Sequence, residues 1–160
     1  MTIDLNLLPR WLEAEVEPKH LDHMNHMNVM WYTHFFDKAI WHWYESFDFG
    51  ASYHTQSGWG SFALETHTRY LSELRVGDRL GVHIRMLARN AKLFHYIMYM
   101  QRLSDGALSA TSELLGIHID MSTRRSAPLP EHIVAYFDGL IAEHAALAWD
   151  AGASGVIKIA

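Results

Sequence analysis

The chain has 160 residues, of which 49% are hydrophobic, so it is long enough for one domain with a substantial core. Acidic residues outnumber basic ones by 18 to 13, which argues against a general nucleic-acid binder, because such proteins usually carry a basic face. The absence of cysteine excludes disulfides, thiol catalysis and thiolate metal sites, and it fits a reducing compartment.

The N-terminal residues predict a strand and argue against export. The first ten residues have no basic start, and Asp4 and Asn6 interrupt their apolar run, so they make a poor secretion signal. No later stretch approaches the length of a membrane span. We therefore expect a cytoplasmic protein with no membrane partner. The segment from Arg10 to Glu17 alternates loosely and ends before Pro18, which is typical of a strand that leads into a loop.

The segment from His20 to Tyr32 carries the clearest chemical signal in the chain. It places the Asp22 carboxylate, three histidines and two asparagines directly ahead of a helical pattern. The free N–H groups at a helix start can polarise a carbonyl, and a carboxylate beside them can act as a base or a nucleophile. No grouping such as His-Glu-x-x-His accompanies the three histidines, so we expect no metal.

The next segment predicts one long, largely buried helix from Val29 to Phe47. Apolar residues recur there at helical spacing, and Gly50 is a plausible stop. These residues are Tyr32, Phe36, Ala39, Trp43 and Phe47.

Beyond residue 60 the apolar period changes to two, which predicts strands. Turn residues at 76–78, 90–92 and 104–106 divide this region into strands of about ten residues, and we expect an antiparallel meander. Residues 121–130 are predicted to form a surface crossover, and residues 131–149 a second helix. Residues 1–149 would then form a single domain, with a loosely structured tail over 150–160.

These elements predict an α+β layer in which a curved antiparallel sheet of about five strands wraps around a long central helix. The order of Asp22, His26, Asn28 and Tyr32 resembles that of the hotdog-fold acyl-CoA thioesterases of the 4-hydroxybenzoyl-CoA thioesterase type. The resemblance extends over roughly residues 10–130. It implies the hotdog fold and a thioester hydrolase that needs no cofactor, since CoA is part of the substrate.

The resemblance also assigns roles to residues. The family residue that matches Asp22 is the catalytic carboxylate, a general base or a nucleophile, and amides at the helix start polarise the thioester oxygen. His26 and Asn28 would orient the water, the carbonyl or Asp22 itself. Asn25 stands where many members have glycine, and Val29 where many have a second asparagine. Asparagine tolerates the left-handed conformation that such a turn needs.

Large aromatic residues near this motif suggest the kind of substrate, although most of them are expected in the core. A pocket walled by such rings favours an aromatic acyl group or a quaternary ammonium group. The residues are Trp31, Tyr32, Trp41, Trp43, Tyr44 and Trp59. The segment from His26 to Asp37 also resembles thioesterases of carnitine breakdown, which release glycine betaine from betainyl-CoA. That resemblance implies a trimethylammonium cage.

The expected substrate-binding residues combine the loop, the aromatic rings and several charged side chains. Basic residues in turns and loops would meet the polyanionic CoA, and a carboxylate in a strand expected to face the helix start could assist. The set is Asn25, Trp31, Tyr32, Trp59, Glu65, Arg89 and Arg124, with Lys92 and Arg125 as further candidates for CoA.

A single hotdog subunit has an open sheet edge and half a cleft. We therefore expect a homodimer, or a dimer of dimers, in which residues from both subunits line each site. Other functions stay open: an enoyl-CoA hydratase-like enzyme, whose histidine follows its aspartate by five residues rather than the four found here, and a non-catalytic acyl-CoA-binding module. Asp22 could also simply cap the helix.

Overall fold

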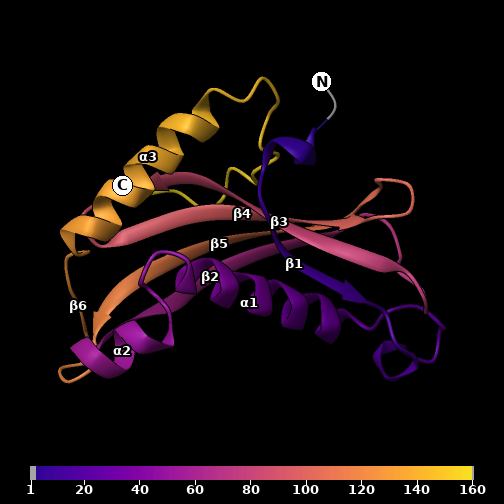
Figure 1. Ribbon diagram of the computed structural model, residues 1–160, viewed down its shortest axis with the longest axis horizontal. Helices are drawn as coiled ribbons and strands as arrows, with labels where there is room; N and C mark the ends of the chain where they lie inside the picture. Colours follow the sequence, from indigo (N-terminus) through magenta and orange to yellow (C-terminus); the bar gives the residue numbers. More distant parts are fainter. Residues whose placement is uncertain (1–2, 160) are drawn as a thin grey trace.

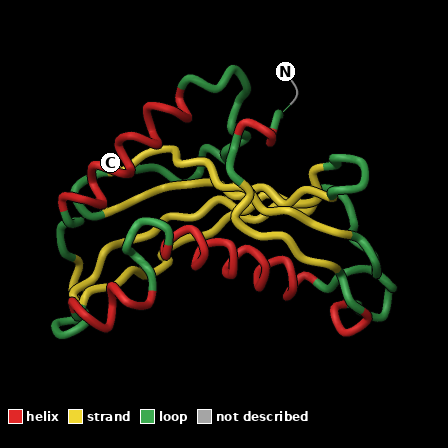
Figure 2. Tube along the Cα trace, viewed as in Figure 1, coloured by secondary structure: helices red, strands yellow, loops and turns green. Residues whose placement is uncertain are grey.

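In the computed structural model, which describes residues 3–159, one antiparallel sheet curls around one long helix (Figures 1 and 2). The strands are β1 (Arg10–Glu15), β2 (Trp59–Tyr70), β3 (Arg79–Arg89), β4 (Leu93–Arg102), β5 (Leu108–Asp120) and β6 (Arg125–Ser126). The helices are α1 (Val29–Glu45), α2 (Ala51–Ser57) and α3 (Glu131–Ala145), with short 3-10 turns at Leu5–Leu7 and Pro18–His20. This is the α+β hotdog architecture that the sequence predicts.

The order of the strands corrects the predicted meander. The sheet runs β1-β3-β4-β5-β2, with β6 beside one end of β5. Strands β3, β4 and β5 pair in sequence, but β2 pairs with β5 instead of β3. Residues 71–78 therefore cross from the β2 edge of the sheet to β3, which lies next to the opposite edge, and Gly77, with a φ of +85°, supplies the left-handed turn before β3. Strands β1 and β2 are the two edges.

Helix α1 is buried because its apolar side chains share one stripe that faces the sheet. They pack against apolar residues of β3 and β4 in the main core. The buried residues of the helix are Tyr32, Phe35, Phe36, Ala39, Ile40, Trp43 and Tyr44. The helix ends two residues before the predicted Phe47. The short helix α2 was not predicted, because its sequence is mostly polar and has no apolar repeat.

The C-terminal end of α1 enters a cluster of interlocking aromatic rings. The Trp43 ring meets Tyr96 edge to face at 5.1 Å and lies 5.9 Å from Phe137 of α3. Its indole N–H donates a hydrogen bond to the Tyr136 hydroxyl at 3.3 Å, and only 1% of Trp43 is exposed. Trp43 is therefore a core residue that is packed on all sides by other rings.

The segment after α3 lies against the outer face of the sheet, opposite α1. Alternate residues of a strand point to opposite faces, so Ile97 and Tyr99 face away from the main core. They form a second, smaller core with Trp149 and N-terminal leucines. The Tyr99 hydroxyl donates to the Ala151 carbonyl at 2.7 Å, and the Ser154 N–H donates to the Glu113 carboxylate at 2.7 Å. Residues 150–159 contain no helix or strand, yet these bonds fix their path.

Four buried histidines predict how the free energy of unfolding depends on pH. Burial lowers the pKa of His20, His83, His118 and His144, so the folded chain favours their neutral form. Their contribution is complete above the unfolded pKa of about 6.5 and is lost as the pH falls below it, because the unfolded chain then binds more protons. We expect the free energy of unfolding to fall between pH 7 and pH 5.5, by up to about 1.4 kcal/mol per pH unit for each histidine.

Urea unfolding at a series of pH values measures this slope. His118→Gln should reduce the slope by about one proton, whereas His132→Gln, at an exposed position in the first turn of α3, should leave it unchanged. An unfolding free energy that stays flat from pH 7.5 to pH 5.5 would contradict the prediction.

Candidate functional site

The residues before α1 form a tight turn that holds Asp22 beside His26. Leu21 and Met27 make an isolated antiparallel bridge, and the Asp22 N–H donates to the His26 carbonyl at 3.0 Å. Asn25 lies at the tip with a φ of +61°. Asparagine is thus in the left-handed conformation that a glycine would adopt more easily, and the turn closes without glycine.

The Asp22 carboxylate is oriented by its own loop. One oxygen accepts a hydrogen bond from the Met24 N–H at 2.8 Å, and the other lies 3.4 Å from Nδ1 of His26. The Asp22 side chain is 23% exposed, and within residues 3–159 no lysine or arginine forms an ion pair with it. Its one close basic neighbour is therefore His26 and not a permanently charged group, and the carboxylate can accept a proton or attack an electrophile.

Asn28, and not Asp22, caps the helix. The Asn28 side-chain oxygen accepts from the Met30 N–H at 3.0 Å, and the Trp31 N–H donates to the Asn28 carbonyl. The backbone N–H of Val29 has no acceptor among the described residues. This N–H lies at the positive end of the α1 dipole, where a developing oxyanion would be stabilised.

A cavity of about 270 Å³ opens beside this helix start. The rings of Tyr32 and Tyr70 meet in it edge to face at 5.2 Å, and burial raises the pKa of Tyr32, so its hydroxyl stays protonated. Asp22 is not one of its lining residues, but its carboxylate lies 3.4 Å from Nδ1 of His26, which is. The lining residues are His26, Met27, Val29, Tyr32, Tyr70, Leu71, Ser72 and Glu73. The carboxylate and the free N–H thus come from one loop and the first turn of α1, and the end of β2 closes the other side of the cavity.

Three of the predicted substrate-binding residues lie away from this cavity. Trp31 is on another side of α1, with its ring 4.3 Å from that of His20 in a cavity beside β1. Trp59 lies at the start of β2 and stacks on His118 at 5.1 Å. Glu65 is exposed in the middle of β2, whereas Tyr70 at the end of that strand meets the helix start. One chain does not gather these residues around Asp22.

Two of the predicted basic residues differ in whether a carboxylate already pairs with them. The Arg89 guanidinium donates to both carboxylate oxygens of Asp138 in α3, so its charge is already paired. Arg124 lies in the turn after β5 with its guanidinium 5.8 Å from the centre of the Phe62 ring, and no carboxylate in residues 3–159 pairs with it.

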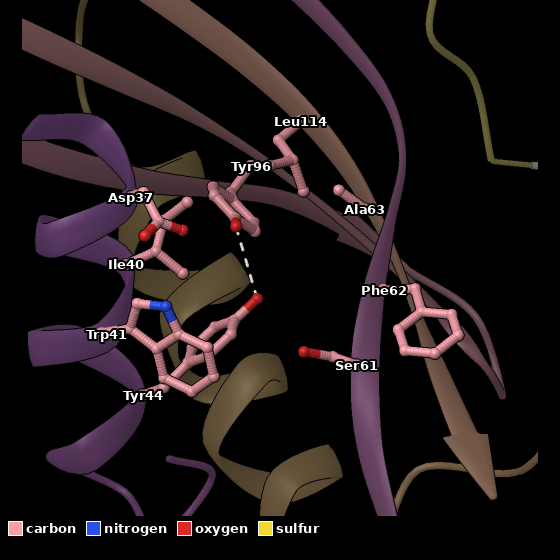
Figure 3. Close-up of a pocket in the computed structure, with 9 residues that line it drawn as sticks. All are labelled: Asp37, Ile40, Trp41, Tyr44, Ser61, Phe62, Ala63, Tyr96 and Leu114. Carbon is pink, nitrogen blue, oxygen red and sulfur yellow. Dashed lines mark hydrogen bonds between the residues drawn. The ribbon is translucent and has the colours of Figure 1, made fainter. Parts of the chain in front are cut away.

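A second cavity, of about 110 Å³, lies between α1 and β2 (Figure 3). The Tyr44 and Tyr96 hydroxyls are 3.3 Å apart within it. Its lining residues are Asp37, Ile40, Trp41, Tyr44, Ser61, Phe62, Ala63, Tyr96 and Leu114. Sequence reasoning did not identify this cavity, because its residues come from strands whose order the sequence does not reveal.

No group of three or more His, Asp or Glu residues within residues 3–159 is placed to hold a metal ion. None of the helices in the described part of the chain is long and apolar enough to cross a bilayer.

Comparison with known proteins connects this geometry to a family. A family model described as the thioesterase-like superfamily matches residues 16–137. The betainyl-CoA thioesterase of Pseudomonas aeruginosa is 27% identical over 147 residues, which cover 92% of each chain. A Staphylococcus aureus protein solved in complex with CoA has a TM-score of 0.83 and 26% identity, and the match covers 96% of both chains.

A longer relative shares the same region. The L-carnitine dehydrogenase/betainyl-CoA thioesterase of Ruegeria pomeroyi is 30% identical over 158 residues, which are 98% of this chain and 32% of that protein. The chain spans 19% to 32% of the length of the relatives that carry this double name.

Proposed function

The chain belongs to the thioesterase-like superfamily, and on this basis we propose that it hydrolyses an acyl-CoA with Asp22 as the catalytic carboxylate. The observation that carries the proposal is the turn before α1. It presents a carboxylate, paired with His26 but with no lysine or arginine, next to a free helix-start N–H and a cavity. Membership of this family and the similarity to a betainyl-CoA thioesterase support thioester hydrolysis as its reaction.

In the mechanism we propose, the thioester oxygen accepts a hydrogen bond from the Val29 N–H. Asp22 removes a proton from a water molecule, and the resulting hydroxide attacks the carbonyl carbon. The negative charge moves to the carbonyl oxygen, where one well-placed donor contributes about 3 kcal/mol. The intermediate then collapses, the carbon–sulfur bond breaks, and the CoA thiolate leaves and is protonated. His26 holds the Asp22 carboxylate in position.

Direct attack by Asp22 is the alternative route. The carboxylate would displace CoA to form a mixed anhydride, which water would then hydrolyse. Both routes use the same carboxylate and the same N–H. Incubation of the enzyme with substrate in ¹⁸O-labelled water distinguishes them, because only the anhydride route can place ¹⁸O in the Asp22 side chain.

We propose CoA as the thiol carrier and betainyl-CoA as the substrate. The CoA-bound relative supports the first assignment, and the names of the sequence relatives support the second. An aromatic acyl-CoA is the other candidate. Arg124 is a better candidate than Arg89 to meet CoA, because Arg89 is already paired with Asp138. No further cofactor enters this reaction.

Release of free CoA thiol from a panel of acyl-CoAs tests this function. The panel contains betainyl-CoA, 4-hydroxybenzoyl-CoA and medium-chain acyl-CoAs. Failure to hydrolyse every member contradicts the proposal, and hydration of an enoyl-CoA in its place would favour the hydratase alternative.

We also propose that the active unit is a homodimer formed through β2. This strand is an edge of the sheet, and its residues 62–67 are all exposed. A long edge strand with exposed apolar side chains can pair with a second copy of itself around a two-fold axis.

Substitution of one exposed residue on β2 tests the dimer. Leu64 is 54% exposed, and Leu64→Glu should weaken self-association at least about tenfold, because like charges would face each other across the axis. Val156→Glu, at a residue 69% exposed in the C-terminal segment, is the matched control. Sedimentation analysis measures both, and a wild-type mass equal to one chain would contradict the proposed dimer.

A further inference from the structure

The small cavity between α1 and β2 combines aromatic walls with a single carboxylate. Figure 3 shows the Trp41 indole and the Tyr44 ring extending from α1, with the Asp37 carboxylate beside them and Tyr96 behind. Trp41 is 45% exposed although it is one of the largest apolar side chains in the chain. An exposed indole at the mouth of an aromatic cavity offers a binding face.

The electrostatics of this cavity favour a positively charged ligand. Asp37 is exposed, and no ion pair joins it to a basic side chain within the described residues. Burial raises the pKa of both Tyr44 and Tyr96, so their hydroxyls stay neutral, and Asp37 is the one charged residue among those that line the cavity. The Arg124 guanidinium lies outside the lining, 5.8 Å from the Phe62 ring. The faces of aromatic rings attract cations, most strongly those that are weakly hydrated. The small volume excludes a long acyl chain.

We propose that this cavity binds the quaternary ammonium end of the acyl group, with Asp37 and Trp41 as specificity residues, and that it serves the thioester held at Asp22 of the partner subunit. The inference rests on the proposed thioesterase function and on the proposed dimer. Beyond that function, it names the residues that select the acyl group and states which subunit supplies them.

The length of α1 explains why the two sites must come from different chains. Asp37 lies eight residues beyond Val29, which is about 12 Å along the helix axis. In betainyl-CoA a single methylene separates the ammonium nitrogen from the thioester carbonyl. A thioester at the start of α1 therefore cannot reach the cavity of its own chain.

The course of β2 brings the partner's cavity to the right place. The cavity uses residues 61–63 of β2, whereas the helix-start cavity uses Tyr70 at the other end of the strand. Antiparallel pairing of two β2 strands about their midpoint places residues 61–63 of one chain opposite residues 66–68 of the other. The aromatic cavity of each subunit would then lie beside the Tyr70 end of its partner.

A pair of matched substrates tests the need for charge. Betainyl-CoA and 3,3-dimethylbutanoyl-CoA have nearly the same shape, but only the first carries a positive charge. We expect the wild-type chain to prefer betainyl-CoA by at least about tenfold in kcat/KM, in line with cation–π and ion-pair attraction. Equal turnover of the two would overturn the proposal.

Substitutions then test which residues cause the preference for betainyl-CoA over the neutral substrate. Asp37→Asn should lower kcat/KM for betainyl-CoA about tenfold and Trp41→Ala about 3- to 30-fold, with little change for the neutral substrate. Trp41→Phe should restore part of the loss. Glu15→Gln removes one negative charge on the β1 side of α1 and serves as the control for a general charge effect. An equal loss with both substrates would show a structural defect and contradict the assignment.

Mixing two defective subunits tests whether the cavity acts on its partner. Asp22→Asn and Asp37→Asn chains are combined and allowed to exchange. If the site is shared, half of the dimers carry one site with both residues intact, and activity returns to about a quarter of wild type. If both residues act within one chain, no mixed dimer has an intact site. Absence of recovery would therefore overturn the shared arrangement.

Binding of glycine betaine separates this inference from the proposed function. Saturation-transfer NMR on its methyl protons needs no turnover, and we expect a signal with wild type and with Asp22→Asn that weakens with Asp37→Asn. Binding without hydrolysis of any thioester would contradict the proposed function alone. Hydrolysis that depends on Asp22 but ignores charge, with no methyl signal, would contradict this inference alone.

Discussion

Asp22→Asn is expected to lower kcat for thioester hydrolysis at least about a hundredfold, because general-base catalysis typically contributes 10² to 10⁴ in rate. An amide can still accept the hydrogen bond from the Met24 N–H, so the turn should keep its shape. It cannot remove a proton from water or form an anhydride. Release of free thiol from the best substrate of the panel measures the change.

Asp120→Asn is the matched control for this experiment. The Asp120 carboxylate accepts a hydrogen bond from the N–H two residues later at 2.8 Å, as Asp22 does, but it lies at the end of β5. The rate of thioester hydrolysis by Asp120→Asn should stay within about twofold of wild type. An unchanged rate with Asp22→Asn, together with retained CoA binding, would instead favour the acyl-CoA-binding module.

Trp43→Ala is expected to lower the free energy of unfolding by about 3–5 kcal/mol, the usual cost of removing a large aromatic side chain from a core. Trp43 is buried among Tyr96, Phe137 and neighbouring rings, so the substitution leaves a cavity that these rigid rings cannot fill. It also removes the partner of the Tyr136 hydroxyl. Urea unfolding at pH 7.5 measures the loss.

Trp41→Ala provides the contrast, because Trp41 lies two residues away on the exposed side of the same helix. It should cost about 1 kcal/mol or less. Equal losses of unfolding free energy for Trp43→Ala and Trp41→Ala would contradict the assignment of Trp43 to the core and Trp41 to the cavity. Together the two substitutions separate a stability effect from a substrate effect.

The sequence predicts the individual elements well, because their signals are local. Helical spacing of apolar residues gives α1 to within two residues of its end, and the period of two gives the long strands. The position of β2 beside β5 could not be predicted, because pairing depends on contacts between residues about fifty positions apart. The short helix α2 was missed because it has no apolar repeat.

For the candidate site, too, the sequence predicts the local turn but not the contacts between distant elements. The turn that joins Asp22, Asn25 and His26 is local, and its left-handed asparagine could be anticipated from the residue type. Trp31 and Tyr32 are neighbours in sequence, but successive residues on a helix point about 100° apart, so they enter different cavities. The pairing of Arg89 with Asp138 depends on where α3 packs, which no local pattern encodes.

The C-terminal segment decides which groups the outer face of the sheet offers to other molecules. Trp149 and the bonds from Tyr99 and Glu113 occupy the convex side of the sheet. A second copy that met this face would therefore contact the C-terminal covering and not the strands beneath it, where the His95–Glu113 pair is buried.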